Sequence, residues 1–392
     1  MPHYAHLIIG GGMTAAAAVT GIREVDSNAT IGLIGAETHP PYNRPPLSKG
    51  LWKGEPIESI WRNTQQPGVA LHLGRQATRL EPATHRVTDD LGTVYTFDKL
   101  LLATGGSPRR LSLGFEDVIY FRSYDDYRHL RALAAERLRF AVIGGGFIGS
   151  EVAAALRMQA RDVVMLMPEQ GPGARVFPAD LSRAVLEYFR DKGVEMRTGD
   201  RLAALTASGG RVAVETTAGD KVEVDVIVAG LGIEPNVDLA RQAGLAVENG
   251  VVVDEFLRTN HPDILAAGDV ANFYNPALRT RMRVEHEDNA NTMGRQAGRN
   301  MAGMPAAYHH LPFFYSDLFE LGYEAVGDVD ARLQTVADWK VPFREGVIYY
   351  LRDGRVCGVL LWNVWNQVDA ARQLIAEPGP FTEQSLAGRL PA

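Results

Sequence analysis

The sequence predicts an α/β protein with two similar parallel-sheet units and a smaller C-terminal α+β region that contains an antiparallel sheet. Two glycine-rich turns, at residues 10–15 and 144–149, each join a short apolar run to an alanine-rich helical pattern. In each half, a second apolar run, which we interpret as a buried strand, ends in glycines, at residues 100–106 and 226–232. Strands that alternate with helical patterns favour parallel sheets, so we expect two units of the same kind.

Both glycine turns match the pattern by which a buried strand turns sharply into a helix. Glycines there let the backbone N–H groups at the start of the helix approach a pyrophosphate, so we expect two dinucleotide sites. The alternative is that the glycines only pack strand and helix closely together. The residues that we expect to line the sites are Gly10, Gly12, Thr14 and Ala15 in the first turn, and Gly144, Gly146, Ile148 and Gly149 in the second.

An acidic residue follows each turn at about the spacing that ribose binding requires. Glu37 and Glu169 each come after a second apolar run, about 20 residues past the glycines. A carboxylate in this place accepts hydrogen bonds from ribose hydroxyls, and its recurrence argues against a purely structural role for the glycines. Glu169 favours NAD over NADP, because a 2′-phosphate would meet its negative charge. Arg175 lies six residues further on and weakens this preference.

Composition and charge exclude several classes of protein. The 392 residues are 46% apolar and 22% charged, with a net charge of −7 and no run of Lys or Arg longer than two, so we expect no binding of nucleic acid. Long apolar runs are absent from the sequence and the first strand starts early, so we expect a cytoplasmic protein with no membrane segment. The single cysteine, Cys357, excludes a Cys-x-x-Cys redox pair. We expect no metal site.

The rest of the chain is predicted from the same signals. Residues 263–269 form another buried run that ends in glycine and aspartate, which we interpret as a return to the first unit. Runs around Asp353-Gly354 predict a hairpin, and residues 366–375 predict a helix. We predict four segments: a first dinucleotide-binding domain at 1–118, a second dinucleotide-binding domain at 119–237, the second part of the first domain at 238–304, and a C-terminal domain at 305–392.

Five segments carry the most specific patterns in the chain: residues 41–49, 144–151, 232–236, 267–269 and 284–286. They resemble flavoproteins that have two Rossmann-like domains for FAD and NAD(P)H, within the ferredoxin reductase and apoptosis-inducing factor branch. The resemblance runs nearly end to end, and the tail segments 316–318, 322–327 and 361–363 resemble apoptosis-inducing factor more than bacterial ferredoxin reductases. It implies FAD on the first unit, NADH on the second, and a C-terminal domain that closes over the flavin.

The resemblance also implies roles for Lys49 and Glu151, which would form an ion pair beside flavin N5, the atom that accepts hydride from the nicotinamide. The sequence adds its own reason. We expect Glu151 in the first turn of a helix that serves a pyrophosphate, where an extra anion needs a cation to neutralise it. The alternative is a helix-favouring acid and a lysine that is merely solvated.

Other positions take their expected roles from the same resemblance. Asp269 would bind a ribityl hydroxyl, and its alternative is to cap a helix. The helix expected at 287–301 would direct its positive end at the flavin. Just before it, Glu285 and His286 would face the nicotinamide and flavin, with Phe147 as a gate; taken alone, His286 would be a structural residue. Further residues are expected at FAD (Arg44, Thr104, Gly105 and Tyr315) and at NAD (Gly232).

Two features remain open to alternative interpretations. Tyr315 stands where these proteins usually have tryptophan before Ser-Asp. Arg279, Arg281 and Arg283 alternate, so on a strand they would face one side and could receive an acidic carrier such as ferredoxin. The alternative is a solvated basic edge that deters strand pairing.

Three functions are compared. The leading hypothesis is an NADH-dependent FAD oxidoreductase that passes single electrons to ferredoxin or another one-electron carrier, since flavins accept electrons in pairs and release them singly. The second is an apoptosis-inducing factor-like redox sensor with slow turnover, a stable charge-transfer complex and a protein partner. A disulfide or peroxide reductase is excluded by the lack of cysteine near Lys49, while oxygen or quinone as acceptor, and a homodimer, stay open.

Overall fold

The computed structural model describes residues 1–391, and their contacts form two compact units. Each unit is assembled from segments that are distant in the sequence. The first unit comprises Met1–Asn43, Ile57–Ser107 and Glu234–Pro312, and the second comprises Arg44–Pro56, Pro108–Ile233 and the chain from Phe313 onward. The predicted domain boundaries at residues 118, 237 and 304 stay predictions.

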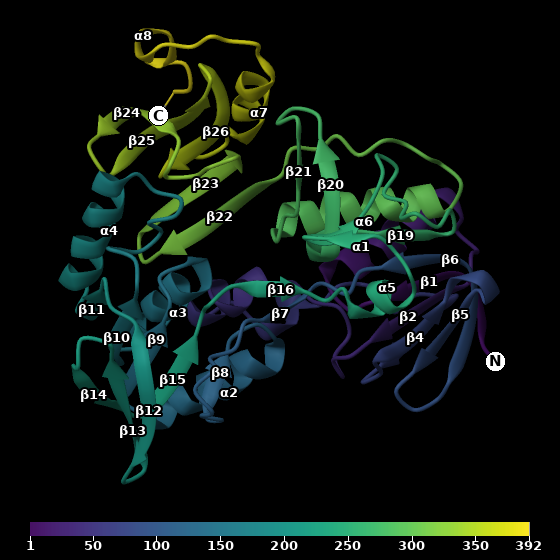
Figure 1. Cartoon of the computed structure of the whole chain (residues 1–392), viewed down its shortest axis with the longest axis horizontal. Coiled ribbons are helices and arrows are strands. Elements are labelled where there is room, and N and C mark those ends of the chain that lie inside the picture. Colours follow the sequence, from purple (N-terminus) through teal and green to yellow (C-terminus); the bar gives the residue numbers. More distant parts are fainter. Residues whose placement is uncertain (392) are drawn as a thin grey trace. The chain divides into compact units, whose positions relative to one another are not determined.

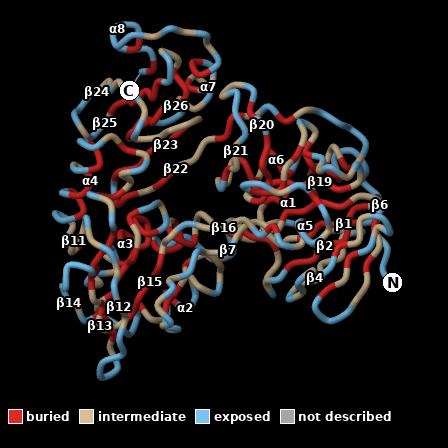
Figure 2. Tube along the Cα trace, in the orientation of Figure 1, coloured by how far each residue is buried: buried red, intermediate tan, exposed pale blue. Residues whose placement is uncertain are grey.

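The first unit contains the parallel sheet that the N-terminal turn predicts. Its strand order is β3-β2-β1-β6-β5-β4, with β19 paired to β6. The pairing of β19 with β6 is parallel, which confirms the predicted return of the chain to this unit. The central strands are mostly buried (Figure 2). The strands span β1 His3–Ile9, β2 Ile31–Gly35, β3 Val69–Leu73, β4 Ala77–Glu81, β5 Arg86–Asp89, β6 Val94–Leu102 and β19 Ile264–Ala266.

Two helices of this unit, α1 (Met13–Val25) and α6 (Glu287–Met301), lie side by side (Figure 1). α6 has the bounds that the sequence predicts. Glycines allow the close approach, since a Cβ atom on Gly298 would lie 2.2 Å from the carbonyl oxygen of Ala18. A small four-stranded sheet follows α5 (Asp238–Gln242), with β17 Val247–Glu248, β18 Gly250–Val252, β20 Ala271–Asn275 and β21 Thr280–Met282.

The second unit repeats the strand–turn–helix arrangement in a sheet of order β11-β10-β9-β15-β8. Its paired strands are parallel, and β9, β10 and β15 are almost entirely buried. The elements span β8 Val118–Tyr120, α2 Tyr124–Glu136, β9 Arg139–Ile143, α3 Phe147–Met158, β10 Asp162–Met167, α4 Ala179–Asp191, β11 Val194–Thr198 and β15 Val226–Ala229. The two predicted parallel-sheet units are therefore confirmed.

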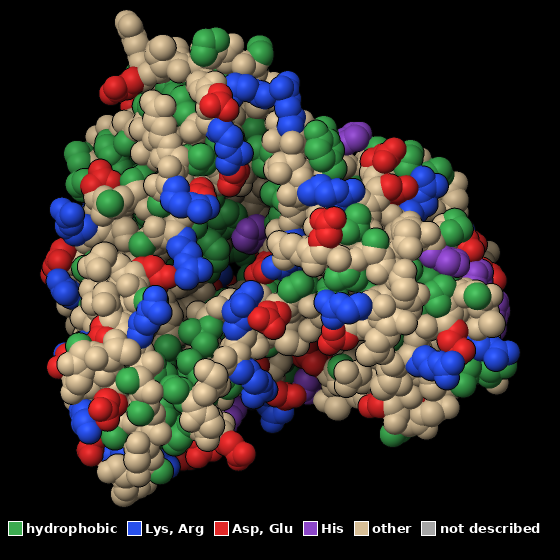
Figure 3. All heavy atoms as spheres, viewed as in Figure 1, with side chains coloured by type: hydrophobic (Ala, Val, Ile, Leu, Met, Phe, Trp, Pro, Cys, Tyr) green, Lys and Arg blue, Asp and Glu red, His purple; other side chains and the backbone are tan. Residues whose placement is uncertain are grey.

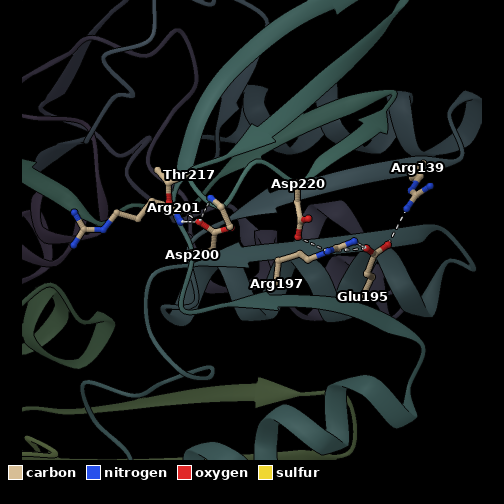
Figure 4. Close-up of polar contacts among 8 residues, drawn as sticks. Arg139, Glu195, Arg197, Asp200, Arg201, Thr217 and Asp220 are labelled. Carbon is tan, nitrogen blue, oxygen red and sulfur yellow. Dashed lines mark hydrogen bonds and ion pairs between the residues drawn. The ribbon is translucent and has the colours of Figure 1, made fainter.

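A three-stranded antiparallel sheet follows β11, with β12 Leu202–Ser208, β13 Arg211–Thr216 and β14 Lys221–Val224. Ion pairs connect it to the parallel sheet (Figure 4): Glu195 lies 2.8 Å from Arg139 and 2.7 Å from Arg197, which lies 2.8 Å from Asp220. These side chains are about one third to one half exposed, so each pair alone stabilises little. We therefore assign these ion pairs a structural role and no role in a functional site.

The C-terminal part of the second unit is an antiparallel sheet of order β22-β23-β26-β25-β24. The predicted hairpin joins β25 to β26, and Asp353 and Gly354 both have positive φ, as a two-residue type I′ turn requires. The predicted helix is α7 (Val368–Ala376). The other elements span β22 Phe313–Leu318, β23 Leu321–Gly327, β24 Gln334–Val341, β25 Glu345–Arg352, β26 Arg355–Trp362 and α8 Glu383–Leu386.

The segment Arg44–Pro56 packs within the second unit, although first-unit residues flank it on both sides in the sequence. Trp52 anchors it: the indole is 3% exposed, donates to the carbonyl oxygen of Leu47, and lies edge-on to Tyr127 with 5.8 Å between ring centroids. Gln159 of α3 donates to the backbone oxygen of Trp52. The second unit thereby fixes the position of Lys49.

Candidate functional site

The first glycine turn leaves a gap in front of α1 that suits a pyrophosphate. A Cβ atom on Gly10, where φ is +128°, would lie 2.0 Å from the carbonyl oxygen of Ala103, so this turn is closed against β6. A Cβ atom on Gly12 would meet no atom of residues 1–391 within 4 Å. Gly12 is the N-cap of α1, so its own side chain cannot cover the first N–H groups. The geometry therefore suits the predicted phosphate site.

Three predicted ligands surround this turn within the first unit. A Cβ atom on Gly268, next to Asp269, would lie 2.2 Å from Thr14 Oγ1, so the end of β19 packs against the start of α1. Asp269 lies inside a 3₁₀ turn whose N-cap is Ala267, so its alternative interpretation as a helix cap is wrong. Glu37 follows β2 and accepts a 2.6 Å hydrogen bond from Tyr42, as a carboxylate presented to a ribose could.

The second turn has the same construction. A Cβ atom on Gly144 would lie 2.5 Å from the oxygen of Gly230, and one on Gly149 would lie 2.1 Å from the oxygen of Gly144. Gly146 is the N-cap of α3, and a Cβ atom there again meets nothing in residues 1–391 within 4 Å. Ile148 is 39% exposed beside this opening. Both turns therefore combine closely packed glycines with one open glycine at the start of the helix, which supports two dinucleotide sites.

Glu169, the predicted ribose acid of the second unit, forms an ion pair that the sequence analysis did not predict. The Arg175 guanidinium lies 2.8 Å from its Oε1 atom. Arg175 is 85% exposed, whereas Glu169 is 25% exposed, so the arginine can leave the carboxylate at small cost. The role of Glu169 at a nucleotide ribose stays a prediction.

Lys49 and Glu151 form the predicted ion pair, with 2.7 Å between Lys49 Nζ and Glu151 Oε1. The lysine side chain is 12% exposed and the glutamate 1% exposed, so water screens the pair little. α3 begins at Phe147, which makes Glu151 its fifth residue, and the first turn contains no acid. The expectation that Glu151 lies in the first turn is wrong, because the glycine turn extends to Gly146.

Two aromatic residues predicted at the cofactors, Tyr315 and Phe147, make ring contacts within the second unit. Lys49 Nζ lies 5.1 Å from the ring centroid of Tyr315, within cation–π range. The ring of Phe147 is tilted against that of Phe314, with 5.0 Å between their centroids. Tyr315 therefore retains an aromatic contact with the lysine, and a flavin role for either ring stays a prediction.

The remaining predicted ligands, Thr104, Gly105, Gly232 and Arg44, lie in loops between the named elements. The side chain of Thr104 donates to the carbonyl oxygen of Asn236, whose side-chain amide donates back to the oxygen of Thr104. Gly105 and Gly232 both have positive φ, which favours glycine. Arg44 donates to the carbonyl oxygen of Arg122 at 2.9 Å. None of these contacts tests a cofactor role, which stays a prediction for each residue.

The start of α6 differs electrostatically from the expectation. His286 is the N-cap, and Glu287 and Asp288 occupy the first turn, where they offset the positive helix end. Asp288 pairs with His310 at 2.6 Å. Burial lowers the pKa of His286 to about 4, against the opposing charges of Asp269 and Asp288, so near pH 7 the imidazole is neutral. His286 could therefore position a ligand but would not supply a positive charge.

The three alternating arginines do not share one strand. β21 spans only Thr280–Met282, and Arg279 before it has a φ of 54°, so the expected alternation is wrong. Arg281 donates to the carbonyl oxygens of Val253 and Asn272. Arg283 pairs with Glu285 at 2.7 Å and is 10% exposed. These contacts favour a structural role for Arg281 and Arg283.

Two serines at the ion pair were missed as site residues. The hydroxyl of Ser48 donates to Glu151 Oε2 and that of Ser316 donates to Glu151 Oε1, each at 2.6 Å. Ser48 precedes Lys49 and Ser316 follows Tyr315. Their position next to predicted site residues is the one feature of the sequence that could have indicated a role at the site. A short polar side chain alone gives no indication of which distant carboxylate it will meet.

Comparison with known proteins agrees with two dinucleotide-binding units followed by a C-terminal region. Residues 4–294 match the pyridine nucleotide-disulphide oxidoreductase family, and residues 297–342 and 338–377 match the C-terminal region of mitochondrion-associated apoptosis-inducing factor. The chain therefore belongs to the pyridine nucleotide-disulphide oxidoreductase family. It is an FAD-dependent, NAD(P)H-dependent oxidoreductase that uses FAD and NAD(H), as the sequence predicts.

Its relatives include both branches that the resemblance indicated. The ferredoxin–NAD(+) reductase component of the anthranilate 1,2-dioxygenase system of Burkholderia cepacia is 35% identical over 97% of this chain and 96% of the relative. Mitochondrial apoptosis-inducing factor 1 of Dictyostelium discoideum is 33% identical over 95% of this chain and 78% of the relative. The reductase in the covalent putidaredoxin reductase–putidaredoxin complex superposes with a TM-score of 0.91, with 29% identity over 99% of this chain and 96% of that chain.

None of the helices in residues 1–391 is long and apolar enough to cross a membrane bilayer. The predicted cytoplasmic location stays a prediction.

Proposed function

We propose that this protein transfers electrons from NADH to a ferredoxin or a similar one-electron carrier. Bound FAD would supply the chemistry that divides a two-electron donation into single electrons. The turn at Gly12 would bind the FAD pyrophosphate, with Glu37 at its ribose and Asp269 at its ribityl chain. The turn at Gly146 would bind NADH, with Glu169 at its ribose. The observation that carries the proposal is that two independent turns each present an open, uncapped helix start.

Lys49 and Glu151 would act at the flavin in this proposal. The ammonium group of Lys49 would hold positive charge beside the position where the flavin gains electrons, and Glu151 would hold Lys49 in place. Because the serines and Lys49 all donate to Glu151, both oxygens of the buried carboxylate have a partner. Phe147 would exclude water from the nicotinamide pocket, and His286 would orient the ring without exchanging a proton.

The acceptor is proposed from the relatives, several of which are named as ferredoxin reductases. The face drawn in Figure 3 carries Lys and Arg side chains interspersed with Asp and Glu.

A cytoplasmic location and a homodimer are also part of the proposal. The single cysteine is consistent with a reducing compartment.

Electron transfer to a carrier is the direct test of this function. We expect NADH to reduce the flavin of the purified protein, and a [2Fe–2S] ferredoxin added afterwards to be reduced in many turnovers, because the reduced flavin can donate electrons one at a time. The measurement is stopped-flow absorbance of flavin and ferredoxin, with NADH and ferredoxin mixed without the protein as control. Slow turnover with every carrier, together with a persistent long-wavelength absorbance after NADH, would instead favour the sensor function that the C-terminal match suggests.

A second test addresses the nucleotide. We expect kcat/KM for NADH to exceed that for NADPH by about tenfold or more, because the 2′-phosphate would approach the carboxylate of Glu169. Glu169→Gln should narrow this ratio by removing the negative charge, and Arg175→Ala should widen it by removing the nearby positive charge. Steady-state kinetics with both nucleotides measure the ratio. Equal use of both nucleotides by the unaltered protein would contradict the assignment of Glu169.

A further inference from the structure

The carboxylate of Glu151 receives donors from two separate segments of the second unit. Lys49 Nζ at 2.7 Å and Ser316 Oγ at 2.6 Å both contact Oε1, while Ser48 Oγ contacts Oε2 at 2.6 Å. Ser48 and Lys49 belong to the Arg44–Pro56 segment, whereas Ser316 belongs to β22. A buried carboxylate requires such partners, but one lysine and one serine would already provide two of them. Ser316 adds a connection to another element.

Ser316 lies in a closely packed part of the C-terminal sheet, so its side chain can hold the position of Glu151. It is 0% exposed and lies opposite Tyr323 in the pairing of β22 with β23. Tyr323 is itself 1% exposed, stacks on Trp362 with 5.8 Å between centroids, and meets Phe177 edge-on at 5.2 Å. The hydroxyl that reaches Glu151 therefore projects from a closely packed aromatic cluster, whose side chains have little freedom to move.

The neighbouring residue on β22 contacts the other member of the ion pair. Tyr315 places its ring 5.1 Å from Lys49 Nζ, while Ser316 binds the carboxylate that faces the same ammonium group. One strand thus contacts both the cation and the anion. If β22 only supported the fold, neither contact would be needed for its pairing with β23, which is made by the backbone.

We propose that Ser316 is a positioning residue for flavin reduction: its hydrogen bond fixes Glu151 Oε1, and Glu151 in turn fixes the ammonium group of Lys49. This inference rests on the proposed function, in which Lys49 acts at the flavin. Ser316 acts only through Glu151 and makes no contact of its own with the nucleotide in this proposal. Loss of its hydroxyl should leave nucleotide binding unchanged while it loosens Lys49.

The first measurement reports on Lys49 itself, in the FAD-loaded protein without NADH. The chain has only six lysines, so reductive methylation can be followed at each one by peptide mass spectrometry. Ser316→Ala should raise the methylation rate of Lys49 by about tenfold, since a hydrogen bond to a charged group is lost. The other five lysines should keep their rates. Ser316→Cys, nearly the same size but a weak donor, should behave as Ser316→Ala and serves if the alanine variant does not fold.

The second measurement is the rate of flavin reduction at saturating NADH. Ser316→Ala should lower it by about tenfold with the NADH dissociation constant unchanged. Ser316→Thr, which keeps the hydroxyl, should restore most of the rate. The matched control is Ser182→Ala in α4, because Ser182 is also buried, at 4% exposure, and donates one hydrogen bond, to the carbonyl oxygen of Pro172 at 2.9 Å.

The outcomes separate the inference from the function on which it rests. Faster methylation of Lys49 and slower reduction in Ser316→Ala and Ser316→Cys, with neither change in Ser182→Ala, would support the role of Ser316. Unchanged values in Ser316→Ala and Ser316→Cys, or equal changes in Ser182→Ala, would overturn it. If Lys49→Ala slows reduction while the Ser316 variants do not, only the inference fails. If NADH does not reduce the unaltered protein, the proposed function fails.

Discussion

Replacing Gly12 by alanine should yield a folded protein that no longer retains FAD, with affinity reduced by about 100-fold, or about 2.7 kcal/mol. The substitution is tolerated by the fold, because φ is −96° and the added Cβ atom meets no atom of residues 1–391 within 4 Å. It would instead occupy the space through which a pyrophosphate approaches the backbone. Flavin absorbance of the purified protein and titration of the apoprotein with FAD measure the effect.

Gly146→Ala is the matched control for this experiment, since Gly146 has the same N-cap position and the same open surroundings in the second unit. This variant should remain yellow and lose affinity for NADH, whereas Gly12→Ala should lose FAD. Thermal unfolding of both apoproteins should resemble that of the unaltered apoprotein. Loss of FAD from Gly146→Ala with retention in Gly12→Ala would reverse the assignment of the two sites.

Lys49→Ala should slow flavin reduction by NADH about 10²-fold, because a preorganised positive group beside the reacting centre is removed. It should also lower the free energy of unfolding by as much as about 3 kcal/mol, since the carboxylate of Glu151, 1% exposed, would keep only the two serine hydroxyls. Stopped-flow absorbance under anaerobic conditions measures the first effect, and denaturant unfolding measures the second.

Lys53→Ala provides the comparison on the same segment. Lys53 pairs with Asp317 at 3.0 Å but is 42% exposed, so its removal should cost no more than about 1 kcal/mol and leave the reduction rate unchanged. A normal rate in Lys49→Ala would remove the ion pair from the proposed mechanism. An equal loss of rate in Lys53→Ala would show that the segment matters and the charge of Lys49 does not.

Local spacing was sufficient to predict the parallel-sheet units and their turns. The glycines at 10–15 and 144–149 act within a few residues of chain, where strand, turn and helix constrain one another directly. The helix at 287–301 and the hairpin at Asp353-Gly354 were predicted for the same reason. Glu37 and Glu169 could be placed because each stands at the end of the strand that follows its turn.

Contacts between residues that are distant in the sequence could not be predicted from local sequence patterns. Lys49 and Glu151 were paired through the family resemblance, and the added argument from the sequence assumed a first-turn position that Glu151 does not have. The donation of Ser48 and Ser316 to Glu151 was missed, because such bonds depend on tertiary packing. The three arginines do not alternate on one strand, because Arg279 takes a left-handed conformation in the turn before β21 and Arg283 lies beyond the end of β21. Glu151 was placed too early in its helix, because α3 starts only at Phe147, after Gly146.

The assignment of Arg44–Pro56 to the second unit has a practical consequence for chimeras built from related reductases. A chimera that takes residues 1–118 from one parent and the rest from another would separate this segment from α3. The buried carboxylate of Glu151 would then lose the lysine with which it evolved. Trp52, Gln159 and Glu151 show that the segment and α3 should be inherited from one parent. Recombination crossovers at residues 43 and 56 would respect this dependence.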